Sequence, residues 1–515
     1  MHRSRLFASL AVVAVTLAAV GPVASQTPRK GGVLRVGMIG EPPTLDQHAT
    51  TAVITRDIGI NMFEGLYTLD ATYQPVPLLA EGHDVADGGK RYTIRLRKDV
   101  KFHNGKPLTS ADVVASLTRW GALASTGKAI FKTVEAVEAR GPNAVEIRLK
   151  EPSVTLLTVL GQVDSAAVIY PKEIVDASEK GLKEFVGTGP FKFVEHKPDR
   201  HIKLARYDGY AARGEAPSGL AGRRTVHVDE ILFMPVPDYA TRQAGMITGE
   251  YDYIQQVKPD QYDRLKSAPG VEPVVVRPYG WVTMVFNLKQ GVMTDKRLRQ
   301  AAQAALDVEP MMLAGMGHKD FYRLDPGLFF QELPWHSRAG AALYNQRDKD
   351  KARRLLKDAG YAGQPLRWIV TTEYEHHYKP AVVAKTQLEE VGFKIDLQVS
   401  DWATVVQRRN KPELWDVFST AFVLVPEPST SAQVLCDWPG WWCSPEKDDL
   451  LRQMQREADP KKRYALWEKV QTIFYEDVGR IKFGDYFTLD AVRKELKGFK
   501  STPEPHFWNV WIDKK

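Results

Sequence analysis

Cysteine is almost absent from the chain, which has two cysteines among 515 residues. Two cysteines cannot supply the paired CxxC motifs of a four-cysteine zinc site. The sequence also lacks the GxSxG turn of many serine hydrolases and the HExxH helix of zinc proteases. These absences remove the usual signatures of nucleophilic and zinc-assisted catalysis, and we do not expect an enzyme.

Concentrated positive charge and low-complexity tracts are also missing. The formal net charge is +7, from 70 Lys and Arg against 63 Asp and Glu, and the basic residues are spread along the sequence. Nucleic-acid binding needs a clustered basic face, so we expect no nucleic-acid partner. The stretch GALASTGKA, Gly121 to Ala129, approaches a phosphate-binding loop. It has one residue too many between its glycines and no hydroxyl residue after the lysine.

There is one long apolar run, Leu6 to Val20, near the start of the sequence. Arg3 and Arg5 precede it and small residues follow, which is typical of a secretory signal peptide cleaved after about Ser25. The run is shorter than the roughly 20 residues that span a bilayer, and an uncleaved anchor is the alternative. We therefore expect residues 1–25 to be removed and the mature protein, with a charge of about +5, to be exported and soluble.

The two cysteines, Cys436 and Cys443, stand close together in the segment CDWPGWWC. An exported protein meets oxidising conditions, so an even pair at this spacing predicts a disulfide that closes a small loop. Metal binding is the weaker alternative, because the spacing is not CxxC. Trp441 and Trp442 inside this loop either cover a ligand or pack the loop itself.

The chain is too long for one hydrophobic core, so we expect at least two domains. Its first half favours sheet. Residues 91–97 and 144–150 alternate apolar and polar side chains, as half-buried strands do, and residues 225–236 hold a third strand. Between the first two strands, Thr109 and Asp112 have the spacing of a capping box and predict the start of a helix.

After about residue 285, helix and strand patterns alternate, which predicts an α/β domain whose strands can lie parallel. A strand over 366–372 leads into TTEYEHHYKP (371–380), a loop with two carboxylates and two histidines, and a strand over 415–423 leads into LVPEPST. Open α/β sheets bind ligands beyond the carboxyl ends of their strands, so both loops should meet a ligand. The expected helices run over 294–306, 351–360, 379–392 and 401–409, with a further strand over 393–400.

Several motifs occur in one fixed order along nearly the whole mature chain. They are GGVLRVGMIGEPPTLD, NMFEGLYTLDATYQPVPLLAEGHDV, GGKRYTIRLRKDVKFHNGKPLTSADVV, GTGPFKF, MVFNLKQGVMTDKRLRQAAQAALD and the cysteine pair ahead of SPEKDDLL. In this order the chain resembles the extracytoplasmic solute-binding proteins of ABC transporters, family 5. That family carries dipeptides, oligopeptides, glutathione and nickel complexes. Each motif alone is weak, but the ordered set is specific.

The resemblance implies an α/β fold of two lobes, a type II or Venus-flytrap binding protein with an extra subdomain in lobe 1. Lobe 1 would comprise residues 26–283 and 483–515, with the subdomain at about 51–185, and lobe 2 residues 284–482. The lobes would close on a ligand between them and dock on an ABC permease, with its ATPase subunits, at the inner membrane. The resemblance also implies a periplasmic monomer without a cofactor.

The sequence departs from the family's peptide binders at two ligand positions. Peptide binders hold the ammonium group with an Asp in a GWxGD segment, but this chain reads AFVLVPEP, with Phe422 for the Trp and Val425 for the Asp. Dipeptide binders pair the ligand carboxylate with an Arg, and here His376 takes that place. A neutral imidazole replaces a bidentate guanidinium poorly, so a dipeptide is disfavoured. A longer or modified peptide, another organic solute and a metal complex all stay open.

Both lobes should contribute further ligand contacts. The TTEYEHHYKP loop would supply hydrogen bonds and negative charge, unless it is a solvated rim, and direct metal binding there is a weaker alternative. Aromatic residues at the lobe crossover would pack on the ligand or in the core, with Trp281 the first choice. A peptide-binding chaperone or sensor without a permease is the alternative from another class. The expected ligand-binding residues are Thr50, Thr51, Met62, Tyr279, Trp281, Glu373, Tyr374, Glu375, His376, Phe422 and Val425.

Overall fold

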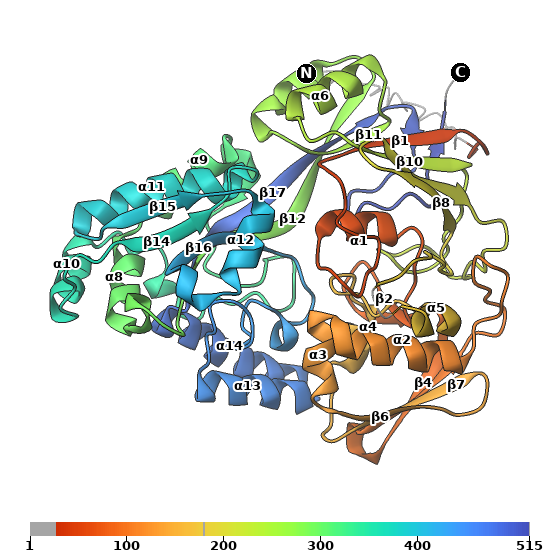
Figure 1. Cartoon of the computed structure of the whole chain (residues 1–515), viewed down its shortest axis with the longest axis horizontal. Coiled ribbons are helices and arrows are strands. Elements are labelled where there is room, and N and C mark those ends of the chain that lie inside the picture. The colour runs from red at the N-terminus through yellow and green to blue at the C-terminus, as the bar shows by residue number, and fades with distance from the viewer. Residues whose placement is uncertain (1–26, 179–180, 514–515) are drawn as a thin grey trace, which may run out of the picture.

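Two long antiparallel strands, β12 (Val271–Phe286) and β17 (Arg480–Arg493), run through the centre of the molecule and connect its two lobes (Figure 1). The computed structural model describes residues 27–178 and 181–513. The expected signal peptide lies outside the described residues. Both strands are long because each takes part in the sheet of one lobe and then in the sheet of the other.

Lobe 1 denotes residues 27–270 and 494–513, and lobe 2 denotes residues 287–479; β12 and β17 connect them. One continuous sheet passes from lobe 1 through β17 and β12 into lobe 2. The third strand expected in the first half is present as β10. From the lobe 1 edge the strands are β8 (Phe191–Lys197), β9 (His201–Arg206), β10 (Glu230–Pro235), β1 (Val33–Met38), β11 (Tyr253–Val257), β17, β12, β16 (Val417–Val423), β14 (Leu366–Val370) and β15 (Ile395–Val399).

A second, four-stranded antiparallel sheet forms a subdomain of lobe 1 (Figure 1). Its core lies between the sheet and α2 (Ser110–Leu123), where Trp120 is fully buried. Helix α2 begins as the capping-box spacing predicts, because the Asp112 carboxylate accepts the backbone N–H of Thr109 at 2.8 Å. The strands are β4 (Ala80–Ala86), β5 (Arg91–Leu96), β7 (Ala144–Leu149) and β6 (Val134–Ala139), of which β5 and β7 were expected from alternation.

The smaller elements of lobe 1 surround these two sheets. Helix α1 (Val53–Gly59) lies between the main sheet and the subdomain and faces the centre of the molecule (Figure 1). The others are β2 (Tyr67–Leu69), β3 (Pro75–Pro77), α3 (Ser125–Phe131), α4 (Leu156–Gly161), α5 (Lys172–Asp176), α6 (Tyr239–Thr248), α7 (Tyr262–Ser267), β18 (Leu496–Lys497) and β19 (Trp511–Ile512).

Lobe 2 is the α/β domain that the alternating pattern predicts. Strand β14 pairs in parallel with both β15 and β16. Four helices bury their apolar residues against one face of the sheet, and on the other face Val405 packs against Ile369 and Phe418. The helices are α8 (Lys296–Ala305), α9 (Val308–Met316), α10 (Lys349–Asp358), α11 (Glu375–Val391), α12 (Trp402–Arg409), α13 (Pro445–Arg456) and α14 (Pro460–Asp477), and the short β13 (Tyr322–Arg323) pairs with β17.

One helix boundary differs from the prediction. The helix expected from residue 379 begins at Glu375, so the second half of TTEYEHHYKP is helical and Pro380 lies inside α11. A proline inside a helix removes a hydrogen bond, which favours a start beside it. Packing overrides that cost, because Pro380 fits tightly against α9. A Cβ added to Gly315 would lie 2.7 Å from Pro380 Cγ.

The two lobes meet where the long strands change partners. The pairing of β12 with β17 shifts register between Val276 and Gly280, and from Gly280 onward β12 also pairs with β16. Gly280 is needed for this close approach. A Cβ there would lie 2.6 Å from the Tyr486 ring and 2.7 Å from the backbone oxygen of Phe422. The glycine therefore allows β17 and β16 to approach β12 closely from both sides at the crossover.

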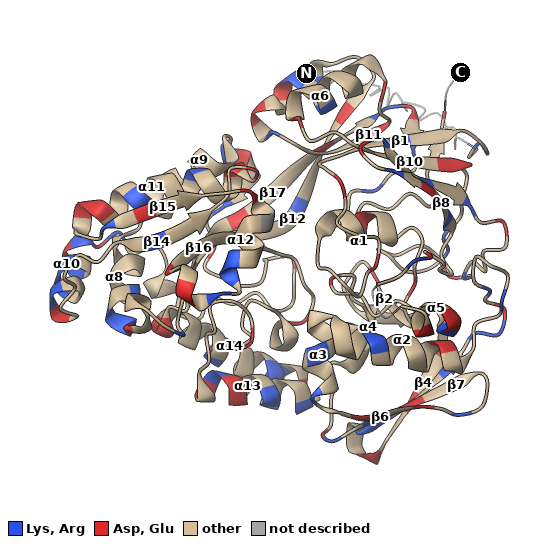
Figure 2. Cartoon of the chain, in the orientation of Figure 1, with Lys and Arg blue, Asp and Glu red and all other residues tan. Residues whose placement is uncertain are grey.

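Charged side chains of both signs are interspersed over the helices of both lobes, as their even spread in the sequence predicts (Figure 2). The expected disulfide between Cys436 and Cys443 is present, with the two Cα atoms 4.5 Å apart. Over the part of the chain that the structure describes, no helix is both long and apolar enough to cross a membrane.

Candidate functional site

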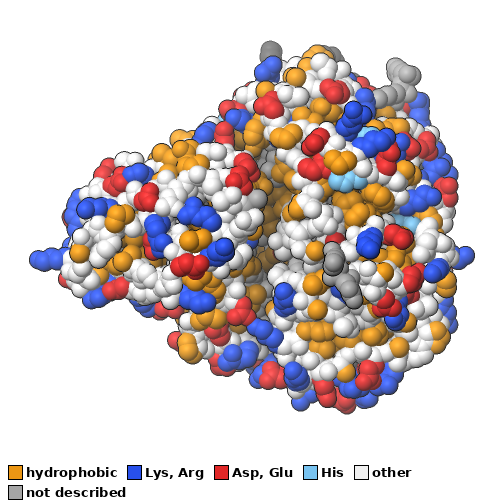
Figure 3. Space-filling view, in the orientation of Figure 1, with side chains coloured by type: hydrophobic (Ala, Val, Ile, Leu, Met, Phe, Trp, Pro, Cys, Tyr) orange, Lys and Arg blue, Asp and Glu red, His pale blue; other side chains and the backbone are white. Residues whose placement is uncertain are grey.

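A pocket that is partly open to solvent lies at the junction of the lobes. Two expected ligand residues, Glu375 and His376, line it from the start of α11, just after β14. Lobe 1 lines it through α6 and the segment after β11, and β17 forms its floor. The surface is hollowed between the two lobes, and apolar side chains are visible in this groove (Figure 3). The carboxyl end of β14 therefore leads to a pocket lined by both lobes, as the sequence predicts.

Glu375 connects the two lobes across this cavity. Its Oε1 accepts a hydrogen bond from Lys258 Nζ of lobe 1 at 2.8 Å, and its Oε2 accepts one from Lys379 Nζ at 2.8 Å. Burial opposes ionisation, but these two ammonium groups lower the pKa of Glu375 below its usual value. Glu375 is therefore a carboxylate at neutral pH, and no pattern in the sequence predicts its partner in lobe 1.

His376 is a stacking group rather than a cation. Its ring lies 4.6 Å from the Tyr486 ring at an interplanar angle of 24°. Burial lowers the pKa of His376 to about 4, although Glu375 opposes this shift. Burial also lowers the pKa of His377 well below its usual value. Both imidazoles are neutral at pH 7, so neither supplies a positive charge at the position where the resemblance leads us to expect one.

The histidines belong to an aromatic group rather than to a metal site. The Tyr374 ring lies 4.9 Å from His377 and 5.4 Å from Trp402 of α12. The two histidine rings are 4.5 Å apart, edge to face. Across residues 27–178 and 181–513, no three His, Cys, Asp or Glu side chains gather so as to hold a metal ion.

The aromatic residues expected at the crossover form a wall, but they do not all reach the groove. Tyr279 is 6% exposed, packs on Tyr486 at 5.6 Å and accepts a 3.4 Å hydrogen bond from the amide of Gln256. Trp281 is 0% exposed and packs on Phe422 at 4.9 Å. The first-choice contact therefore lies behind Phe422, in the core of lobe 2, and offers no surface to a ligand in this conformation.

The ligand-binding residues expected from lobe 1 differ in their exposure to solvent. Thr50 is half-buried and Thr51 is exposed, and both precede α1. The Thr50 hydroxyl accepts the backbone N–H of Ala52 at 3.1 Å. Met62 is completely buried in the core of lobe 1, so it is not part of a ligand surface. The resemblance predicts that the NMFEGL motif faces the cleft, but the Met62 side chain is buried and packs in the core.

In lobe 2, Val425 is half-buried and packs against the aromatic core beside Phe422, and Glu373 is exposed. The nearest carboxylate to Val425 in the sequence is Glu427. It is buried and pairs with Arg463 at 2.5 Å, so it does not replace the missing Asp. The segment after β16 therefore supplies no free carboxylate for a ligand ammonium group.

A charged group in lobe 1 was not predicted. Arg56 of α1 pairs with Asp57 at 3.2 Å and with Glu504 at 3.8 Å, and Gln255 donates to Asp57 at 2.6 Å. Burial raises the pKa of Asp57, Asp164 and Glu504, although Arg56 opposes each shift. Asp57 and Glu504 are more than 400 residues apart, and no local pattern shows that they meet.

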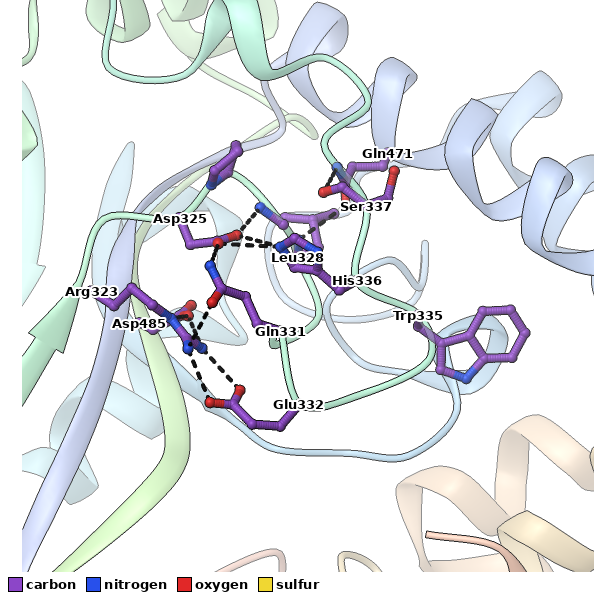
Figure 4. Close-up of polar contacts among 12 residues, drawn as sticks. Arg323, Asp325, Leu328, Gln331, Glu332, Trp335, His336, Ser337, Gln471 and Asp485 are labelled. Carbon is purple, nitrogen blue, oxygen red and sulfur yellow. Dashed lines mark hydrogen bonds and ion pairs between the residues drawn. The ribbon is translucent and has the colours of Figure 1, made fainter. Parts of the chain in front are cut away.

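A polar network fixes the segment after β13 against β17 (Figure 4). Arg323 donates to Asp485 at 2.9 Å and to Glu332 at 3.0 Å. Asp325 accepts from His336 at 3.0 Å. In Figure 4 the His336 side chain converges on Asp325, whereas Trp335 points away from this network. Asp325 and Asp485 are buried, and the network gives each of these carboxylates a hydrogen-bond donor.

The lobes also touch at the far side of the groove. Lys132 of the subdomain pairs with Asp437 in the disulfide loop, and Glu151 pairs with Arg456 of α13. The backbone N–H of Val154 donates to the oxygen of Gln455 at 2.8 Å. Together with the Lys258–Glu375 pair, these contacts bridge the groove at both sides.

The chain matches known proteins consistently over most of its length. The family model of bacterial extracellular solute-binding proteins, family 5 Middle, matches residues 74–438. A probable peptide ABC transporter periplasmic-binding protein, y4tO of Sinorhizobium fredii, is 27% identical over 90% of this chain and 91% of its own length. The oligopeptide-binding protein AppA of Bacillus subtilis is 25% identical over 95% of this chain and 93% of its own.

A solved structure confirms the two-lobed fold. The ABC transporter-associated periplasmic binding protein DppA of Helicobacter pylori, in complex with the peptide STSA, superposes with a TM-score of 0.82 at 21% identity. The match covers 94% of this chain and 99% of that one.

Proposed function

Because the chain belongs to the bacterial extracellular solute-binding proteins of family 5, we propose that it captures a peptide or peptide-like solute between its lobes and delivers it to an ABC permease. Two relatives at 25–27% identity over nine-tenths of the chain carry peptide-binding names. The protein acts by binding alone. It passes its solute to the permease, which works together with its ATPase subunits.

One observation carries this proposal: a single cavity receives side chains from both lobes and from the strand that joins them. A ligand there touches Lys258 and Glu375 at once, from opposite lobes. A solute can favour the closed state only through contacts made to both lobes together. A cavity within one lobe would store a ligand without reporting its presence to the permease.

The finer assignments belong to the same proposal. With β12 and β17 divided between the lobes, the proposed bounds are 26–283 and 483–515 for lobe 1, with a subdomain at about 51–185, and 284–482 for lobe 2. The protein works in the periplasm after losing residues 1–25. The ligand contacts come from Thr50, Thr51, Tyr279, Glu373, Tyr374, Glu375, His376, Phe422 and Val425. The register of β12 against β17 shifts between Val276 and Gly280, which supports a lobe boundary close to residue 283.

A thermal-shift screen tests the proposal. The protein, expressed without residues 1–25, is unfolded and refolded to release carried ligand. It is then mixed with di- to pentapeptides, glutathione, nickel–histidine and non-peptide organic acids. A ligand at 100 times its Kd adds about 2.7 kcal/mol of stability, which raises the Tm by a few degrees. We expect tri- to pentapeptides to shift the Tm more than dipeptides do. A shift with organic acids or nickel–histidine and none with any peptide would refute the peptide assignment.

A further inference from the structure

Two arginines on the lobe 2 side of the molecule have no anionic partner among the described residues. Arg480, at the start of β17, is 0% exposed. Its Nε and Nη2 have no hydrogen-bond partner among the described residues, and its Nη1 donates to the oxygen of Ala432 at 3.4 Å. Arg409, at the end of α12, is half-buried, and its Nε is likewise buried without a partner in the described chain. No described carboxylate lies within the 4.0 Å of an ion pair from either group.

The same tryptophan holds both arginines. The guanidinium carbons of Arg409 and Arg480 lie 5.4 Å and 5.2 Å from the centre of the Trp438 ring. Arg409 also lies 5.7 Å from the Trp402 ring, and Arg480 lies 5.3 Å from the Phe422 ring. Aromatic faces fix a guanidinium in place, but they offset little of the cost of taking its charge out of water.

Other buried cations of this region are neutralised or hydrogen-bonded. Lys482 pairs with Asp485 at 2.6 Å, and Arg463 pairs with Glu427 at 2.5 Å. Arg299 donates to the backbone oxygens of Met293 and Asp477 at 2.8 and 2.9 Å. The missing counter-charge is therefore local to Arg409 and Arg480. Burial without a compensating group lowers the pKa of Arg480 to about 9 and that of Arg409 to about 10, so both remain cations at pH 7.

This arginine pair lies at the ligand side of lobe 2. Trp438 packs at 4.9 Å against Phe422, which stands at the carboxyl end of β16. Trp402 packs at 5.4 Å against Tyr374, just after β14. Trp438 also belongs to the disulfide loop, whose Asp437 pairs with Lys132 of lobe 1. The arginines are thus bounded by the strand ends on one side and by a loop that contacts lobe 1 on the other.

We propose that Arg409 and Arg480 form an anion subsite on the lobe 2 side of the groove, which takes a carboxylate group of the solute. The subsite rests on the proposed function, because it needs a ligand held between the lobes. Arg409 binds the carboxylate through its guanidinium fork, held between two indole faces. Arg480, in contact with the same Trp438 ring, supplies the second positive charge.

The test compares each tri- to pentapeptide as the free acid with its C-terminal amide, and adds glutarate and citrate as non-peptide carboxylates. Titration calorimetry on the refolded full mature chain measures Kd for the wild type, Arg409→Met and Arg480→Met. We expect free acids to bind at least 30-fold more tightly than amides, and each variant to lose most of that ratio. Arg408→Met is the matched control. Arg408 neighbours Arg409 on α12 but donates to Gln398 and to the Leu414 oxygen, so its variant should keep the ratio.

A second readout separates binding from structure. If the arginines served only packing, Arg480→Met would lower the Tm of the ligand-free protein. An unpaired buried charge held for a ligand predicts the reverse, a higher Tm with weaker binding. Equal affinity for acids and amides, or variants that keep the wild-type ratio, would overturn the subsite, as would the absence of binding by every carboxylate probe. If glutarate or citrate binds with the expected arginine dependence and no peptide does, the subsite stands and the peptide assignment fails.

Discussion

Lys258 of lobe 1 and Glu375 of lobe 2 meet across the cavity, with Nζ and Oε1 2.8 Å apart. Glu375 occupies the first turn of α11, where the N-terminal end of the helix dipole favours a negative charge. Lys379, one turn further on, donates to the other carboxylate oxygen. The carboxylate is therefore held by its own helix, and Lys258 reaches it from lobe 1.

Removing Lys258 should weaken closure modestly. Both side chains of the Lys258–Glu375 pair are about one-third exposed, so the pair contributes up to about 1 kcal/mol. We expect Lys258→Met to raise the Kd of a bound solute by up to about fivefold and to increase the radius measured by small-angle X-ray scattering without ligand. Lys349→Met is the control, because Lys349 pairs with Glu390 inside lobe 2. Equal effects of both variants on Kd would show that the interlobe pair has no special role.

Asp490 should make the protein more stable as pH falls. Burial raises its pKa from 3.8 to about 6, although hydrogen bonds from Tyr253 and the backbone N–H of Gln256 favour the carboxylate. Between these two values the folded state binds more protons than the unfolded state, so stability decreases as pH rises. We expect this group to contribute about 1 kcal/mol more at pH 5 than at pH 7.5. Urea unfolding of Asp490→Asn should show that contribution gone, and an unchanged pH dependence would contradict the assignment.

His376 should make the protein less stable as pH falls. Its folded pKa of about 4 lies below the usual 6.5, so the unfolded state binds the proton first and stability falls as pH drops through this window. The loss between pH 7.5 and pH 5 is at most about 2 kcal/mol, and partial exposure of the ring reduces it. His376→Phe keeps a ring on Tyr486 and should remove this loss. Thermal unfolding at the two pH values checks it. A variant with the wild-type slope would assign the pH dependence to His377 or another group.

Much of the fold was predictable because local patterns determine it. The strands around Ile94 and Ile147 follow alternation, and α8 follows the apolar spacing of Leu298, Ala301 and Ala302, all of which are buried. The predicted start of α11 was wrong because the contact of Pro380 with Gly315, 65 residues away, outweighs the local preference of proline for the beginning of a helix. Propensity is local, whereas packing is not.

The site was predictable where it follows a strand end. Glu375 and His376 line the shared cavity because β14 ends just before them. Trp281 was placed in the ligand set from its position at the crossover, but which face of β12 it takes depends on the register with Phe422. The pairing of Arg56 with Glu504, and of Arg409 with Trp438, joins distant segments, so no spacing in the sequence reveals it.

The disulfide should stabilise the ligand side of lobe 2 more than the loop itself. Joining Cys436 to Cys443 closes a short loop, for which chain entropy predicts about 2.5 kcal/mol. This loop carries Trp438, which contacts both unpaired arginines. We therefore expect the double variant Cys436→Ser, Cys443→Ser to lower the urea midpoint and to weaken solute binding in the same protein. Asp437→Asn, which removes only the contact with Lys132, is the control. If the double variant loses stability but binds as the wild type does, the loop is a structural staple and the position of Trp438 does not matter for the ligand.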